Sequence, residues 1–117
     1  MTINEFLQEY RKTGAYGVNV CRPRVRCADG FTASVQAGAG IYSMPRVDAD
    51  CYTHVVIGYP SEREDLWMAY AENVKKPRDT VYGYVPVEVV DKALEKHGGI
   101  AGADFSNCGS EWEDGER

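Results

Sequence analysis

A hairpin in the first third of the chain constrains the fold more than any other feature of this sequence. Asp29-Gly30 favours a two-residue turn, because glycine readily adopts the positive φ that such turns require. The predicted arms are residues 25–28 and 31–37. One face of the second arm carries only apolar side chains, namely Phe31, Ala33, Val35 and Ala37. This alternation predicts an antiparallel sheet that is covered on one side.

Further segments extend the predicted sheet. Residues 51–59 are rich in β-branched and aromatic side chains and are expected to form the central strand, and residues 80–85 form another. Residues 66–70 fit either a strand or a helical turn, and we favour a strand because large apolar groups would then lie on both faces. Residues 16–21 are expected to be extended. Residues 38–50 are expected to form a long connection.

Helices are predicted at both ends of this strand-rich region. Thr2 and Glu5 form a capping-box pattern ahead of an apolar stripe with helical spacing. Pro86 suits the first turn of a second helix, which Gly98 and Gly99 would end. The sequence thus predicts the α+β class: a mainly antiparallel sheet of four to five strands, packed by an N-terminal and a C-terminal helix.

The length of 117 residues fits a single domain, which we place at residues 1–100. Residues 101–117 are rich in glycine, serine and acidic side chains and are expected to form a flexible, disordered acidic tail, in which Trp112 could dock. No run of about 18 apolar residues and no export signal are apparent, so we expect a cytoplasmic protein that does not enter the membrane. The four cysteines are then expected to be free thiols.

The charge distribution indicates the kind of partner. The net charge is -5, and residues 48–73 hold six acidic side chains against Arg63 alone. Such a surface repels nucleic acid and attracts basic proteins, so direct nucleic-acid binding is not expected. Carboxylates in irregular turns, together with tyrosines, form our predicted partner-binding site. Its residues are Asp48, Asp50, Tyr59, Glu62, Glu64, Asp65 and Tyr70.

Three alternating arginines precede and enter the first arm of the hairpin. On an extended chain Arg22, Arg24 and Arg26 would point to one side and form a basic stripe. Without a wider basic field they are a weak nucleic-acid signal, and we interpret them as a solvated strand face. Whether they bind a partner is left open by the sequence.

A zinc site or a thiol enzyme is the main alternative. Cys21, Cys27, Cys51 and His54 are the residue types that zinc prefers. Their spacing argues against it, because Cys51 and His54 would lie on opposite faces of a strand. His97, near the end of the second helix, is expected to cap or pack. We therefore predict no catalytic residue, no metal and no cofactor.

The chain resembles a group of short uncharacterised proteins encoded by phages and prophages of gut Firmicutes. The resemblance covers about residues 1–100, and its segments are TINEFL at 2–7, GAY at 14–16, YGYVPVEVVD at 82–91 and KHGGI at 96–100. It carries over no functional residue. It implies a genomic setting in which small acidic proteins often inhibit bacterial defence machinery, anti-CRISPR proteins among them.

Together these features predict a non-enzymatic phage or mobile-element protein, in the cytoplasm of the bacterial host cell. We expect it to bind and inhibit a host protein with a basic surface, such as a CRISPR effector, as a monomer or homodimer. The alternatives are the zinc or thiol enzyme and a structural protein that acts by oligomerisation.

Overall fold

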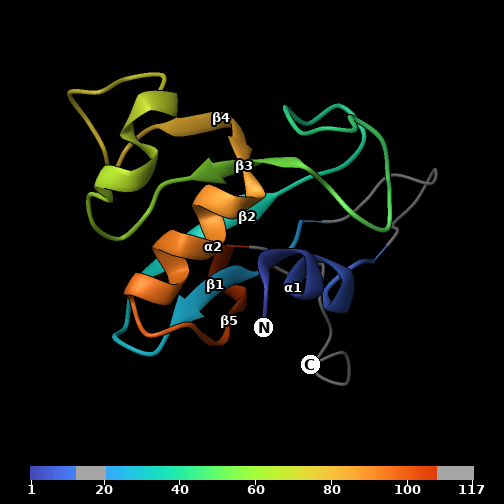
Figure 1. Cartoon of the computed structure of the whole chain (residues 1–117), viewed down its shortest axis with the longest axis horizontal. Helices are drawn as coiled ribbons and strands as arrows, with labels where there is room; N and C mark the ends of the chain where they lie inside the picture. Colours follow the sequence, from blue (N-terminus) through green and yellow to red (C-terminus); the bar gives the residue numbers. More distant parts are fainter. Residues whose placement is uncertain (13–20, 108–117) are drawn as a thin grey trace.

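The computed structural model of the chain describes residues 1–12 and 21–107 (Figure 1). Its centre is a five-stranded antiparallel sheet with the strand order β4-β3-β2-β1-β5. The strands are β1 (Arg24–Cys27), β2 (Thr32–Gln36), β3 (His54–Gly58), β4 (Val81–Pro86) and β5 (Ile100–Asp104). The helices are α1 (Ile3–Glu9), α2 (Val87–Lys96) and the 3-10 helices η2 (Asp65–Tyr70) and η3 (Phe105–Asn107). The predicted α+β class is confirmed.

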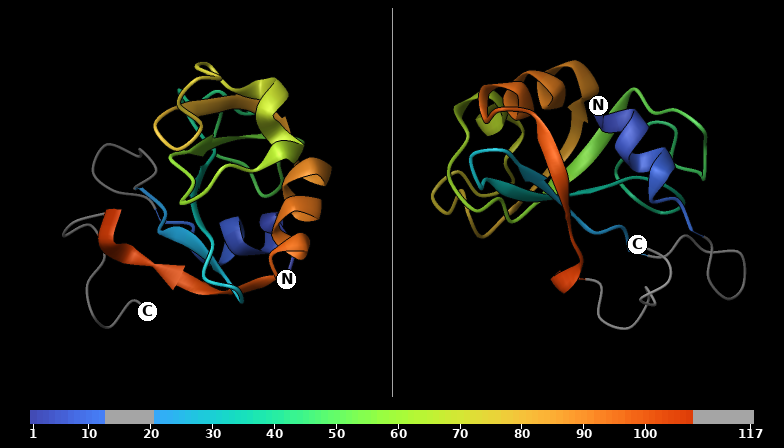
Figure 2. Two further views of the ribbon diagram at one scale, coloured as in Figure 1. Left: turned by 90° about the vertical axis from the view of Figure 1, so that its left-hand side faces the viewer. Right: turned by 90° about the horizontal axis from the view of Figure 1, so that it is seen from below.

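The core lies between one face of the sheet and the helices α1 and α2, which both cover that face (Figure 2). Alternate strand residues point into it, as Val25, Ala33 and Val35 do. Burying such side chains contributes about 1.5–3 kcal/mol each. The helices and η2 complete the core with Ile3, Phe6, Leu7, Trp67, Val90, Ala93 and Leu94.

Local sequence explains where α1 begins. The Thr2 hydroxyl accepts the backbone N–H of Glu5, and the Glu5 carboxylate accepts that of Thr2, which is the predicted capping box. The Ile3 backbone N–H donates to Asp91 of α2 over 2.7 Å, so the two helices are also joined directly. No helix among the described residues is long and apolar enough to cross a membrane.

The hairpin has the predicted arms and a slightly longer turn. Cys27 accepts the Gly30 N–H and donates to the Phe31 carbonyl, so the loop contains three residues, with Gly30 at a φ of +95°. This is a type I turn followed by a bulge residue, the next most common solution after two-residue turns. The hairpin places β2, rather than β3, at the centre of the sheet, which corrects the prediction for residues 51–59.

The strand predicted at residues 66–70 is the helix η2. The Glu64 carboxylate accepts the Leu66 N–H over 2.8 Å and so caps its first turn. In this geometry Trp67 enters the core while Leu66 stays exposed. The complete burial of Trp67 is therefore more favourable than a strand that would carry apolar groups on both faces.

The first residues of the predicted tail join the sheet. Residues 100–104 form β5, which pairs with β1, so the ordered domain extends past residue 100. Alanine and glycine give this segment little strand propensity, and its place is set by backbone pairing with β1. The prediction of an extended segment at 16–20 and of a flexible tail at 108–117, with Trp112, lies outside the described residues.

The three arginines do not form one stripe. Pro23 interrupts the alternation, and the Arg22 side chain turns into the core, where Nε donates to the Leu7 carbonyl over 2.9 Å and Nη1 to the Ala37 carbonyl over 2.8 Å. Arg24 is half-buried on the outer face of the sheet and Arg26 is exposed. Arg22 is therefore a structural residue, since its donors satisfy one carbonyl group of α1 and one that directly follows β2.

Candidate functional site

The acidic residues proposed as a partner-binding site lie in two separate places. Asp48 and Asp50 belong to the connection between β2 and β3, where both accept hydrogen bonds from Arg11, with 2.9 Å from Arg11 Nε to Asp48 Oδ1. Glu62 and Asp65 are exposed at the opposite end of the sheet, around the start of η2 (Figure 1). The structure therefore does not bring these carboxylates into one ridge.

Glu64, which lies between Glu62 and Asp65 in the sequence, has a fully buried side chain. Its Oε2 lies 2.9 Å from Lys96 Nζ, and its Oε1 lies 2.9 Å from His97 Nε2. Burial by itself would raise the pKa of Glu64, but the Leu66 N–H, Lys96 and His97 outweigh it and hold the pKa below its ordinary value. This carboxylate links η2 to α2 and does not face a partner.

His97 continues the same network to the hairpin turn. Its Nδ1 lies 2.7 Å from Asp29 Oδ2, and its ring stacks on Phe31 with 4.0 Å between the centroids. The Phe31 backbone N–H, and then His97, lower the pKa of Asp29. Both ring nitrogens of His97 thus contact carboxylates of the chain itself. The network is a structural tie between three parts of the chain.

The residues of the alternative zinc or thiol site are not gathered. Cys27 is in the core, and burial raises the pKa of its thiol to about 11, so it is not a thiolate at neutral pH. Cys51 is exposed, and the His54 ring lies 2.9 Å from the Thr53 hydroxyl. Within residues 1–12 and 21–107 no three histidine, cysteine or acidic side chains are placed to hold a metal ion.

The two proposed tyrosines lie at the η2 end of the molecule. Tyr59 follows β3 with 52% of its surface exposed and a φ of +48°, and its carbonyl accepts a hydrogen bond from Arg24. Tyr70 is half-buried at the end of η2 and packs against the core. β3 separates both from Asp48 and Asp50, so the seven proposed residues do not share one surface.

A different pair of exposed tyrosines stacks ring on ring. Tyr42, from the connection between β2 and β3, is 50% exposed, and Tyr84 of β4 is 39% exposed. Their rings stack with 5.7 Å between the centroids, and the Tyr84 N–H donates to the Tyr42 carbonyl over 3.1 Å. Two segments far apart in the sequence thus present one aromatic surface.

Three more exposed side chains follow Tyr42 closely in the sequence. The guanidinium of Arg46 lies 5.3 Å from the centre of the Tyr42 ring, within the range of a cation–π contact. Met44 is 48% exposed and Val47 is 56% exposed on the same connection. We call Tyr42, Met44, Arg46, Val47 and Tyr84 the tyrosine patch.

The backbone at Tyr84 is held in an unfavourable conformation. Its φ is +51°, a left-handed value that costs a residue with a side chain about 1–2 kcal/mol. The cause is a bulge in β4, where Gly83 and Tyr84 together oppose Val56 of β3. A bulge re-aims the side chain that it carries, here out of the sheet and onto Tyr42.

The connection that carries the patch is held firmly although it contains no long strand. The buried hydroxyl of Ser43 accepts the Gly38 N–H and donates to the Pro45 carbonyl over 2.8 Å. The hydroxyl of the buried Tyr52 donates to the Val47 carbonyl and accepts the Ala49 N–H. The patch is therefore preorganised, which lowers the entropic cost of binding a partner.

Two acidic side chains follow the patch residue Val47 on the same connection. Asp48 follows Val47 directly, and Asp50 lines a shallow hollow of about 470 Å³ on α1. The other residues around this hollow are Asn4, Glu5, Gln8 and Glu9. Two of the proposed acids thus lie on the same connection as Tyr42, which is not one of the tyrosines named from the sequence.

The sequence contains only a weak signal for the tyrosine patch. Tyr82-Gly83-Tyr84 resembles a regular strand, in which Tyr82 and Tyr84 would share one face, and only the bulge sends Tyr82 into the core and Tyr84 outward. Comparisons with models of protein families, with curated proteins and with solved structures found no match for this chain.

Proposed function

We propose that the chain is a protein-binding domain that acts by occupying a surface of its partner rather than by catalysis. The tyrosine patch is the centre of the binding surface, and Asp48 and Asp50 lie at its rim. The observation that carries this proposal is the exposed stack of Tyr42 and Tyr84, which forms because a bulge in β4 holds Tyr84 at a φ of +51°. Strain that does not improve the core is typical of functional sites.

The composition of the patch supports a protein as the partner. Tyrosine, methionine and arginine are the residue types that are enriched at protein interfaces, where aromatic and arginine side chains contribute most of the affinity. A rigid aromatic centre with a charged rim is also the usual anatomy of such interfaces.

The charges beside the patch favour a partner with a basic surface. Asp48 and Asp50 follow Val47 on the same connection, and the base that contacts both of them, Arg11, belongs to this chain. We propose a bacterial host protein whose basic groove normally holds nucleic acid, in the first instance a CRISPR effector, in line with the resemblance to phage proteins. Carboxylates and tyrosine rings both attract arginine.

Purified CRISPR effectors are the direct test, with Tyr84→Ala as the main variant. Its matched control is Tyr59→Ala, because Tyr59 is also exposed and also has a positive φ, but follows the end of β3 and is not part of the tyrosine patch. We expect Tyr84→Ala to weaken binding by at least about tenfold and Tyr59→Ala to leave it unchanged. Affinity should also fall with salt, since the rim is charged.

The opposite pattern would contradict the assignment of the surface. If Tyr59→Ala, or charge reversal at Glu62 and Asp65, weakens binding while Tyr84→Ala does not, the partner docks at the η2 end. If no effector binds the wild-type chain, the proposal of a CRISPR effector is wrong. Melting temperatures of all variants show whether a loss reflects misfolding.

A further inference from the structure

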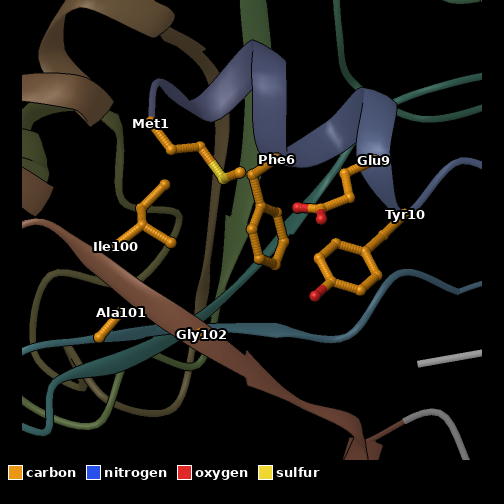
Figure 3. A pocket seen from close by; sticks show the side chains of 7 residues that line it. All are labelled: Met1, Phe6, Glu9, Tyr10, Ile100, Ala101 and Gly102. Atoms are coloured by element: carbon orange, nitrogen blue, oxygen red, sulfur yellow. The ribbon is translucent and has the colours of Figure 1, made fainter.

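A second surface lies at the other edge of the sheet from Tyr84. Strand β5 is an edge strand, since β1 is the one strand among the described residues that pairs with it. Beside it is a hollow of about 240 Å³ that residues of α1 and β5 line (Figure 3). Its lining residues are Met1, Phe6, Glu9, Tyr10, Ile100, Ala101 and Gly102.

The hydrogen bonds of β1 show which backbone groups of β5 face outward. The Cys27 N–H donates to Phe31 toward β2, whereas the Ala28 N–H donates to Gly99 toward β5. Because backbone groups alternate between the two edges of a strand, the N–H and carbonyl of Arg26 face β5. Those of its partner Gly102 therefore face β1. The next residue, Ala103, therefore directs its N–H and carbonyl to the open edge.

The shape of the edge suits an added strand. No segment within residues 1–12 and 21–107 pairs with the outer side of β5, and its residues from Ile100 to Ala103 carry no charge and no proline, which are the usual means of blocking an edge. A bulge at Ala101 ends the regular register next to the hollow. An added strand would thus pair beside Ala103 and pass along the hollow.

The hollow has the size and chemistry of a side-chain pocket. In Figure 3 the side chains of Phe6 and Tyr10 extend from α1 toward β5, and the Met1 side chain lies between Phe6 and Ile100. A volume of about 240 Å³ is below the usual range for small-molecule sites, about 300–1,000 Å³, but is suitable for one large apolar side chain. The exposed carboxylate of Glu9 stands at its rim and favours a basic neighbour.

We propose that the β5 edge binds an extended polypeptide segment of a partner protein by strand addition. One large apolar side chain of this segment enters the hollow, and a lysine or arginine beside it lies next to Glu9. Backbone hydrogen bonds along the edge supply affinity, and the hollow supplies specificity. This site is distinct from the tyrosine patch, because β5 and β4 are the two opposite edges of the sheet.

The test is a selection of peptides from a random octapeptide library on the full-length chain. The decisive variant is Ala103→Pro, which removes the outward N–H of an edge strand and leaves the pairing of Gly102 and Asp104 with β1 intact. Ala103→Ser keeps that N–H and is the matched control. We expect selected peptides to combine one large apolar residue with a nearby base, and to bind Ala103→Pro at least about tenfold more weakly than Ala103→Ser.

A second variant covers the case in which Ala103→Pro does not fold. Glu9→Lys reverses the charge at the rim, and a lysine suits the last turn of α1, so stability should be unchanged or slightly higher. We expect it to weaken the basic peptides and to favour acidic ones, whereas Tyr84→Ala should have no effect on peptide binding. That separation distinguishes this site from the tyrosine patch.

Amide hydrogen exchange provides a readout without mutation. The Ala103 amide should exchange faster than the Gly102 amide in the free protein and slow down when a selected peptide is added. The proposal is overturned if no peptide is enriched, if peptides bind Ala103→Pro and Ala103→Ser equally, or if the Ala103 amide stays unprotected. It is also overturned if the chain forms a dimer that Ala103→Pro dissociates, because a second copy would then occupy the edge.

Discussion

Glu64 is the centre of the buried ionic network that joins η2 to the end of α2. Its carboxylate caps η2 through the Leu66 N–H and contacts Lys96 and His97 of the α2 end. Removing one partner from a buried ionic network leaves the other charges without compensation, which costs more than an intact network contributes. A substitution of Glu64 should therefore lower the free energy of unfolding more than a substitution of the exposed acids nearby.

Glu64→Gln keeps the shape of the side chain and removes its charge. We expect the free energy of unfolding to fall by about 2–3 kcal/mol, below the full cost of a broken buried pair because Lys96 is half-exposed and can turn to water. Urea denaturation measures the change. Glu62→Gln is the control, since exposed substitutions usually stay within about 0.5 kcal/mol. Equal losses in the two variants would contradict the assignment.

The same network predicts how stability depends on acid. The pKa values of Asp29 and Glu64 lie below their ordinary values of 3.8 and 4.5. A carboxyl group with a lowered pKa stabilises the fold fully above its ordinary value, and this contribution is lost as the pH falls through the folded-state pKa. Unfolding free energies should thus decline below about pH 4.5, and less steeply in Glu64→Gln. Parallel slopes in the two proteins would contradict this account.

At the scale of elements, the end of α2 is fitted to the hairpin turn. Gly98 and Gly99 both have positive φ values, +92° and +86°. A Cβ at Gly98 would lie 2.8 Å from the Ala28 Cβ, whereas one at Gly99 would meet nothing within 4 Å. The two glycines thus carry the same backbone cost but differ in the space around them.

Alanine at each glycine should separate these effects. Gly99→Ala should lose about 1 kcal/mol, from the positive φ alone, and Gly98→Ala about 2–4 kcal/mol, because it also collides with Ala28. The additional substitution Ala28→Gly should restore part of the loss in Gly98→Ala and none in Gly99→Ala. Chemical denaturation of the four variants gives the comparison. Equal losses at the two glycines would show that the contact is absent.

The bulge in β4 directs Tyr84 out of the sheet and does not add to the core. Tyr84→Gly relieves a strain of about 1–2 kcal/mol but adds about 0.5–1 kcal/mol of backbone entropy and loses the stacking on Tyr42. We expect stability to remain within about 1 kcal/mol of the wild type by thermal melting. Tyr82→Ala, which empties a buried site, should lose about 3 kcal/mol or more. A similar loss in Tyr84→Gly would mean that Tyr84 supports the core.

At the scale of the whole molecule, local patterns predict the fold better than the site. The capping box at Thr2 and the hairpin turn at Asp29-Gly30 act over a few residues, so their outcome can be derived from the sequence. Strand β5 and the buried Arg22 depend on segments that meet after folding. Composition cannot predict such contacts, and alanine and glycine in β5 even indicate a loose tail.

The candidate site depends on the same kind of distant contact. The acidic run at residues 61–65 suggests an exposed ridge, but Glu64 finds Lys96 and His97 and becomes buried. Tyr42 and Tyr84 meet because a bulge turns one strand residue outward. Charge and residue type therefore indicate a protein partner, while only the assembled sheet indicates where it would dock.

The most direct measurement is the hydrogen-exchange footprint of the chain in complex with the effector that binds it. The account predicts slower exchange in residues 41–50 and 83–85, which carry the tyrosine patch, and unchanged exchange in residues 59–65. Protection confined to residues 59–65, or no protection at the tyrosine patch, would contradict it.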